Sequence, residues 1–229
     1  MKRFAITTLA ALGILAGAVP VARAADTTCP PTPTGKINGN LVVPAGASCS
    51  LANVTVTGNV QVGKGASLTV VPITGQTVTI GGNVQAAQCQ QVSLHANPGG
   101  VLSVGGNVQI RNCTGGGGYQ GAAVTISGNF ACDYNSAECF AIDGKVCGNV
   151  QVNNNSNGSG LGALVARNNV GGNVQVNNNS AGGDSDNLVS GNTIGGNLKC
   201  VGNTPGVTDE SVKNIVTGNK QGQCAGANF

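Results

Sequence analysis

The sequence predicts an all-β fold, a right-handed parallel β-helix of about nine coils that contain 19–24 residues each. The first supporting observation is a repeat, because nine Gly-Asn units follow one another at steps of 19–24 residues along the 229-residue chain. The second is the alternation of apolar and polar residues on both sides of each Gly-Asn unit, which is typical of strands that bury one face. The third is the presence of further strand-like runs in each repeat, such as residues 66–71 and 76–80. The six-residue period of a left-handed β-helix is not visible, so we predict the right-handed form.

Aligning the nine repeats on the glycine of Gly-Asn gives columns of one chemical type. The residue two before the glycine is Val or Ile in every repeat, and the residues two and four after it are mostly aliphatic. Between these two aliphatic columns lies a column that is Gln in six repeats, with Val42, Ala131 and Lys199 as the exceptions. We therefore expect the aliphatic columns to line the core and the Gln column to face solvent.

The asparagine of each Gly-Asn unit predicts a ladder of stacked side chains. Stacked amides can donate hydrogen bonds from one coil to the next, and Asn tolerates the left-handed backbone of a turn. The expected ladder consists of Asn40, Asn59, Asn83, Asn107, Asn129, Asn149, Asn173, Asn197 and Asn219. Seven residues after the glycine, a second and shorter ladder is expected from Asn135, Asn155, Asn179 and Asn203.

The nine cysteines predict four disulfides and one free thiol. One pair occupies the same column in consecutive coils, and two others would fasten the ends, where a β-helix exposes strand edges and an open core. The predicted pairs are Cys89–Cys113, Cys29–Cys49, Cys200–Cys224 and Cys139–Cys147. Cys132 falls in an inward column and is predicted to be a buried free thiol. No Cys-x-x-Cys or Cys/His spacing indicates a metal site.

The first 24 residues have the features of a cleaved secretory signal peptide. Two basic residues precede an apolar run over 4–19, and Ala22-Arg23-Ala24 has the small-x-small pattern of a cleavage site. The run is too short to span a membrane comfortably, and no later segment is apolar enough to do so. We therefore predict a bacterial secreted protein, extracellular or periplasmic. Its mature part is expected to be a single β-helix domain over 25–229, with caps over about 25–38 and 204–229.

The Gly-Asn-Val-Gln-Val units, the inward Val and Ile columns and the Asn ladders resemble those of secreted right-handed β-helix proteins of the pectate-lyase-like superfamily. This resemblance covers nearly all of the mature chain and implies its architecture. The chain is less similar to curli-type fibre subunits, because its abundant cysteines and irregular loops depart from that family. Among proteins of the pectate-lyase-like fold, lyases hold Ca²⁺ with acidic residues beside a basic Arg or Lys, and hydrolases use a cluster of Asp.

One set of polar residues is a candidate for such chemistry. Arg111, Asp133, Glu138, Asp143 and Lys145 fall in neighbouring coils. Arg111 and Asp133 share a column, so a surface ion pair is the simpler interpretation. No lyase or hydrolase motif is matched, and we expect no catalytic residue, metal or cofactor.

The column three before the glycine suggests another surface. It contains Thr55, Thr79, Thr125 and Thr193, and flat rows of Thr order water in β-helical ice-binding proteins. Paired Thr rows occur only in places here, so an exposed strand is the simpler interpretation.

The sequence thus favours an exported, non-catalytic β-helix scaffold of a cell surface or matrix, because no convergent set of titratable groups is visible. The expected partner is a surface glycan or matrix polymer. Nucleic acid is excluded because cleavage of the signal leaves eight basic against eight acidic residues, and aromatic residues are only 3% of the chain. A polysaccharide-active enzyme and an ice-binding protein are the alternatives.

Overall fold

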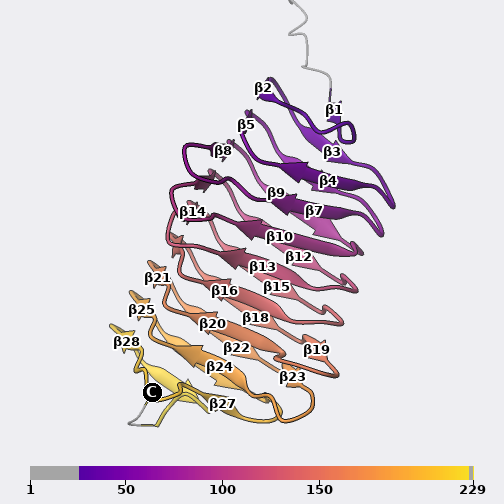
Figure 1. The fold of residues 1–229 in the computed structure, drawn as a ribbon. Helices are drawn as coiled ribbons and strands as arrows, with labels where there is room; N and C mark the ends of the chain where they lie inside the picture. Colours follow the sequence, from indigo (N-terminus) through magenta and orange to yellow (C-terminus); the bar gives the residue numbers. More distant parts are fainter. Residues whose placement is uncertain (1–25, 227–228) are drawn as a thin grey trace, which may run out of the picture.

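The chain folds into a stack of β-strand turns with no helix in the residues that the computed structural model describes, which are 26–226 and 229. Every strand pairs in parallel with the equivalent strand of the next turn, and the turns stack into a column from the N-terminal to the C-terminal end (Figure 1). This arrangement confirms the predicted parallel β-helix. The signal peptide predicted over 1–24 lies outside the described residues.

Three long sheets form the walls of the column. Sheet A contains β1 (Thr27–Thr28), β3 (Leu41–Val43), β6 (Val60–Val62), β9 (Val84–Ala87), β12 (Val108–Arg111), β15 (Phe130–Asp133), β18 (Val150–Asn153), β22 (Val174–Asn177), β26 (Leu198–Val201) and β29 (Lys220–Gly222). Sheet B contains β2 (Gly35–Ile37), β5 (Val54–Val56), β8 (Thr77–Ile80), β11 (Val101–Val104), β14 (Val124–Ile126), β17 (Lys145–Val146), β21 (Asn169–Val170), β25 (Thr193–Ile194) and β28 (Ile215–Val216). Sheet C contains β4 (Ser48–Leu51), β7 (Ser67–Val70), β10 (Gln91–His95), β13 (Gly117–Gln120), β16 (Cys139–Ile142), β20 (Ala163–Ala166), β24 (Asn187–Ser190) and β27 (Val207–Thr208). A short pair links β19 (Ser156–Asn157) to β23 (Ser180–Ala181).

The structure has about seven full turns, fewer than the nine predicted. The difference lies at the ends of the stack. The last Gly-Asn unit is followed only by β29, so it begins a turn that is not completed. Val216, which occupies the core column in β28, is only partly buried, so the aliphatic core also becomes thinner in this region.

The register follows the predicted columns. Val84, Val108 and Phe130 stack in sheet A, and they are fully buried. The Val and Ile column two before the glycine lines the core from sheet B, from Ile37 to Ile194. Because strand side chains alternate between faces, these aliphatic columns meet inside while the columns between them face outward. The result is one continuous core along the column.

Four disulfides are present, and three of them confirm predicted pairs: Cys29–Cys49, Cys89–Cys113 and Cys200–Cys224. The fourth prediction is wrong, because Cys132 bonds to Cys139 and Cys147 is free. Cys132 in β15 and Cys139 in β16 are both fully buried, so they meet inside the corner between sheets A and C. Cys147 is exposed and cannot reach that interior. Four disulfides indicate an oxidising environment.

Candidate functional site

The outer surface of sheet A carries three parallel rows of polar side chains, and we call it the amide face. The first row is the predicted Asn ladder, which we call the outer ladder. The second is the Gln row, three residues after each glycine. The third is a short row on the ends of β12, β15, β18 and β22, formed by Arg111, Asp133, Asn153 and Asn177.

The outer ladder is continuous from the first turn to the last. From Asn59 to Asn197, each Nδ2 donates to the Oδ1 of the preceding ladder residue over 3.0–3.3 Å. The backbone N–H of each ladder residue, including Asn219, donates to the same oxygen over 2.8 Å. At the N-terminal end, Asn40 Nδ2 donates to Asp26 Oδ1 over 3.0 Å. The predicted ladder is therefore confirmed, and a carboxylate terminates it.

The ladder explains why glycine precedes each Asn. At eight of the nine positions, a Cβ added to the glycine would lie 2.5–2.6 Å from the Oδ1 of the preceding ladder residue. This is closer than real Cβ atoms approach, so a side chain there would displace the ladder. Gly39, which begins the first repeat, is the position with a positive φ, 117°. Close approach between turns, more than backbone conformation, therefore requires this glycine.

The predicted left-handed backbone of the ladder residues is wrong, because none of them has a positive φ. Of the nine non-glycine residues with a positive φ in the described part of the chain, five lie in another column, six after the glycine, where φ is 54–59°. This column consists of Gln88, Asn112, Tyr134, Asn154 and Asn178. The sharp turn from sheet A towards sheet C is made here.

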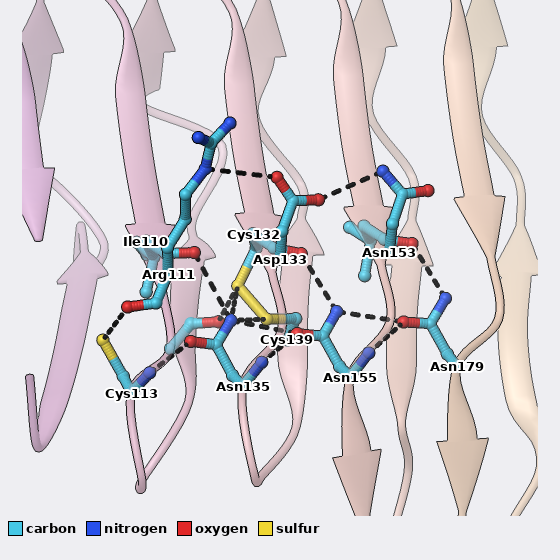
Figure 2. Close-up of a disulfide and its surroundings, with 12 residues drawn as sticks. Ile110, Arg111, Cys113, Cys132, Asp133, Asn135, Cys139, Asn153, Asn155 and Asn179 are labelled. Atoms are coloured by element: carbon cyan, nitrogen blue, oxygen red, sulfur yellow. Dashed lines mark hydrogen bonds and ion pairs between the residues drawn. A yellow bond between two sulfur atoms is a disulfide. The ribbon is translucent and has the colours of Figure 1, made fainter. Parts of the chain in front are cut away.

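Two further ladders lie inside the molecule. The predicted second ladder runs from Asn135 through Asn155 and Asn179 to Asn203, and Gln223 Oε1 accepts its last bonds. Figure 2 shows its first three members beside the Cys132–Cys139 disulfide. A third ladder, formed by Asn168, Asn192 and Asn214, was not predicted from the sequence. The residue four before the glycine is aliphatic in most earlier turns, so this column did not suggest a ladder. The signal that could have revealed it is the spacing of the three Asn, which are 24 and 22 residues apart.

The buried ladders use hydrogen-bonding groups that the outer ladder leaves free. In the buried ladders, the second N–H of each amide donates to a backbone carbonyl: Asn155 to Cys132, Asn179 to Val152 and Asn203 to Val176, over 2.7–2.9 Å. In the outer ladder, Nδ2 donates only to the preceding Oδ1, whereas each internal Oδ1 accepts two bonds and so has both lone pairs occupied. The outer ladder therefore offers solvent one free N–H per turn and no free acceptor.

The Gln row has a gap at one turn. Gln109, Ala131 and Gln151 stack in register, so the small Ala leaves a space between two long side chains. A hollow of about 200 Å³ lies here, lined by Ala131, these two Gln and Arg111 together with outer-ladder residues. We call it the Ala131 hollow.

The third row contains the predicted ion pair. Arg111 Nε lies 3.5 Å from Asp133 Oδ2, and Asn153 Nδ2 donates to Asp133 Oδ1 over 3.1 Å (Figure 2). Asn177 Nδ2 donates in turn to Asn153 Oδ1 over 3.0 Å, and its own buried Oδ1 has no partner in the structure. Burial raises the pKa of Asp133, although the bond from Asn153 and the charge of Arg111 oppose the rise.

The other members of the candidate polar cluster do not join this pair. Asp143 forms a two-bond ion pair with Arg167 at the turn between sheets C and B, with Nε–Oδ1 at 2.7 Å. Lys145 lies on sheet B in β17, and its side chain is exposed. Glu138 precedes β16, and burial raises its pKa. Arg111 and Asp133 thus pair on sheet A and Asp143 pairs with Arg167, so the five residues do not form one cluster.

Two other surfaces have distinctive compositions. The column of Thr55, Thr79, Ser103 and Thr125 forms an outward row on sheet B, in register, before Lys145 continues it. A hollow of about 360 Å³ beside His95 and Asp143 is lined mainly by small apolar residues such as Ala122 and Ala123. The first surface repeats hydroxyl groups over four turns before Lys145 interrupts it, and the second has no repeated polar group, whereas the outer ladder runs along the whole stack.

Within residues 26–226 and 229, no three His, Cys, Asp or Glu side chains are grouped so that they could hold a metal ion. The same part of the chain contains no helix suited to crossing a membrane. Comparisons with protein-family models, curated proteins and solved structures found no match for this chain.

Proposed function

We propose that this protein is an exported, non-catalytic scaffold whose amide face binds a surface glycan or matrix polymer. The observation that carries the proposal is the free N–H that the outer ladder offers at each turn. Successive donors are spaced by one inter-strand distance, about 4.8 Å. A repeated row of this kind suits a long ligand with many oxygen acceptors, since such a polymer can be contacted at several turns at once.

Export is part of the proposal and has two supports. The N-terminal sequence has the pattern of a cleaved signal peptide, and four disulfides suit an extracellular or periplasmic location. The ladders and disulfides also suit a rigid scaffold. Each turn is tied to the next by backbone bonds, side-chain amides and, at the two ends, by disulfides.

The test is retention of the mature protein on cellulose, chitin, agarose-linked heparin and alginate gel. A double variant, Gln61→Glu with Gln175→Glu, places charges on the amide face, where these outward side chains are not needed for the core. The matched control, Thr79→Glu with Thr193→Glu, places the same charges on sheet B. We expect at least one polymer to retain the wild-type protein and the sheet B variant, and to retain the sheet A variant differently.

Retention by none of the four polymers, or equal behaviour of the two double variants, would contradict the proposal. The same preparations separate the alternatives. Release of new reducing ends or unsaturated products would indicate an enzyme, and thermal hysteresis lost in the sheet B variant would indicate ice binding on the Thr row.

A further inference from the structure

We infer that the Ala131 hollow is a subsite for an oxyanion, a carboxylate or sulfate group carried by the polymer. This inference rests on the proposed function and gives it a place and a ligand chemistry. The hollow lies where the Gln row is interrupted. The same face has two further hollows, one lined by Gln residues and Arg111 without any ladder Asn, and one lined by two ladder Asn and Lys199. The Ala131 hollow differs from both because it combines three ladder Asn with a guanidinium.

The outer-ladder side chains around the hollow offer hydrogen-bond donors and no free acceptors. Asn107, Asn129 and Asn149 line it, and each has an Nδ2 that donates one bond within the ladder and keeps one N–H free. The Oδ1 of each already accepts two bonds from the following turn. These three residues can therefore donate to a ligand but cannot accept from it, which selects a group rich in acceptor lone pairs.

The charge beside the hollow is positive. Arg111 is the titratable residue that lines the hollow, and its side chain is half exposed. Its Nε faces Asp133, while the two Nη atoms have no hydrogen bond to the described residues and lie at the free end of the side chain (Figure 2). Asp133 is only 6% exposed and does not line the hollow, because its carboxylate is turned to Arg111 and Asn153. An anionic oxygen in the hollow would meet a guanidinium and free amide donors, which form the stronger, charge-assisted bonds.

The hollow has space for a ligand group, and the side chains beside it can adapt to that group. At about 200 Å³, the hollow has room for several water molecules, and an oxyanion can replace them. Gln109 and Gln151 lie one turn above and one turn below Ala131, and their half-buried side chains make no hydrogen bond to the described residues. Their amides are free to turn their N–H groups towards the ligand. A Gln at position 131 would occupy the same space and close the hollow.

The experiment uses three polymers with one backbone: dextran, carboxymethyl-dextran and dextran sulfate. Their affinities for the mature protein are measured by calorimetry for the wild type, Ala131→Gln and Val42→Gln. Val42→Gln is the matched control, because it fills the other aliphatic gap of the same row, beside Gln61 and away from the hollow. We expect the wild type and Val42→Gln to bind one or both charged dextrans, and Ala131→Gln to bind about tenfold more weakly, the factor for one lost hydrogen bond to a charged group.

A second measurement keeps the test independent of any effect on folding. In ¹H–¹⁵N spectra of the wild-type protein, the charged dextran should shift the side-chain amide signals of Asn107, Asn129 and Asn149 more than those of Asn59 and Asn197. The charged polymer that binds more tightly identifies the group, carboxylate or sulfate. Equal affinity of Ala131→Gln and wild type, or amide shifts spread evenly along the ladder, would overturn the subsite but leave polymer binding by the amide face intact. Binding of neutral dextran but of neither charged dextran would also overturn the subsite and leave polymer binding intact. If none of the dextrans binds and none of the four polymers above retains the protein, the proposed function is overturned as well.

Discussion

The second ladder should contribute more to stability than the outer ladder, and Asn155→Ala compared with Asn107→Ala measures the difference. The Asn155 side chain is 1% exposed and takes part in four hydrogen bonds of 2.9 Å. It accepts from the backbone and side-chain nitrogens of Asn135 and donates to Cys132 O and Asn179 Oδ1. At about 1 kcal/mol for each of these four net bonds, the expected loss is at least about 4 kcal/mol.

Asn107 takes part in three ladder bonds, but it is only partly buried, so water can replace the lost partners. The expected loss for Asn107→Ala is about 1 kcal/mol. The free energy of unfolding is measured by urea titration with far-ultraviolet circular dichroism, with the disulfides intact. A loss below about 1.5 kcal/mol for Asn155→Ala, or equal losses for the two variants, would refute the reasoning that burial of the ladder sets its contribution.

Three further variants test other parts of the structure. Because burial raises the pKa of Asp133, the folded state binds the carboxyl proton more tightly than the unfolded state, and the stability of the wild type should fall as pH rises from below about 4 through the raised pKa. Asp133→Asn has no such proton to lose, so its stability relative to the wild type should increase as pH rises. The same stability difference between variant and wild type in urea titrations at pH 3 and pH 7 would contradict this prediction. Gly148→Ala should reduce the free energy of unfolding by about 2–4 kcal/mol in the same assay, because its Cβ would lie 2.5 Å from a ladder oxygen. Gly158→Ala is the control, because its Cβ would have no atom within 4 Å, and it should change stability by less than about 0.5 kcal/mol. Similar losses for the two variants would contradict the conclusion that close approach between turns requires glycine. Val201→Asn should add about 1 kcal/mol by donating to the unpaired Asn177 Oδ1 of the neighbouring strand, and a neutral or destabilising result would show that this oxygen gains no partner.

The repeat made sheets A and B predictable, because their columns keep one register along the whole chain. The Gly-Asn unit marks where each turn enters sheet A, so the outer ladder, the Gln row and the core columns follow by counting. Sheet C was harder to place, since the connections before it vary in length and shift its residues relative to the glycine. Its strands contain the inward Tyr119, whose hydroxyl donates to Asn168 of the third ladder over 3.0 Å.

The wrong disulfide illustrates the same limit. Counting along columns finds pairs that stack between turns, such as Cys89 and Cys113, but Cys132 and Cys139 are joined across a corner within one turn, seven residues apart. Such a pair depends on how sharply the chain turns between sheets A and C. That turn is made by residues with a positive φ, such as Tyr134. A Tyr does not predict a positive φ, because bulky residues rarely adopt one. The Ala131 hollow, in contrast, was visible in the sequence as an exception in the Gln column.

The most direct test of the account is the hydrogen exchange of the two side-chain amide protons on each ladder Asn, followed in ¹H–¹⁵N spectra of the mature protein. In the structure, the outer ladder keeps one free N–H per turn whereas the second ladder keeps none. This arrangement predicts one slowly and one rapidly exchanging proton on Asn107, Asn129 and Asn149, and two slowly exchanging protons on Asn155 and Asn179. Two equally protected protons on the outer-ladder residues would contradict it, because the amide face would then have no free donor to offer a ligand.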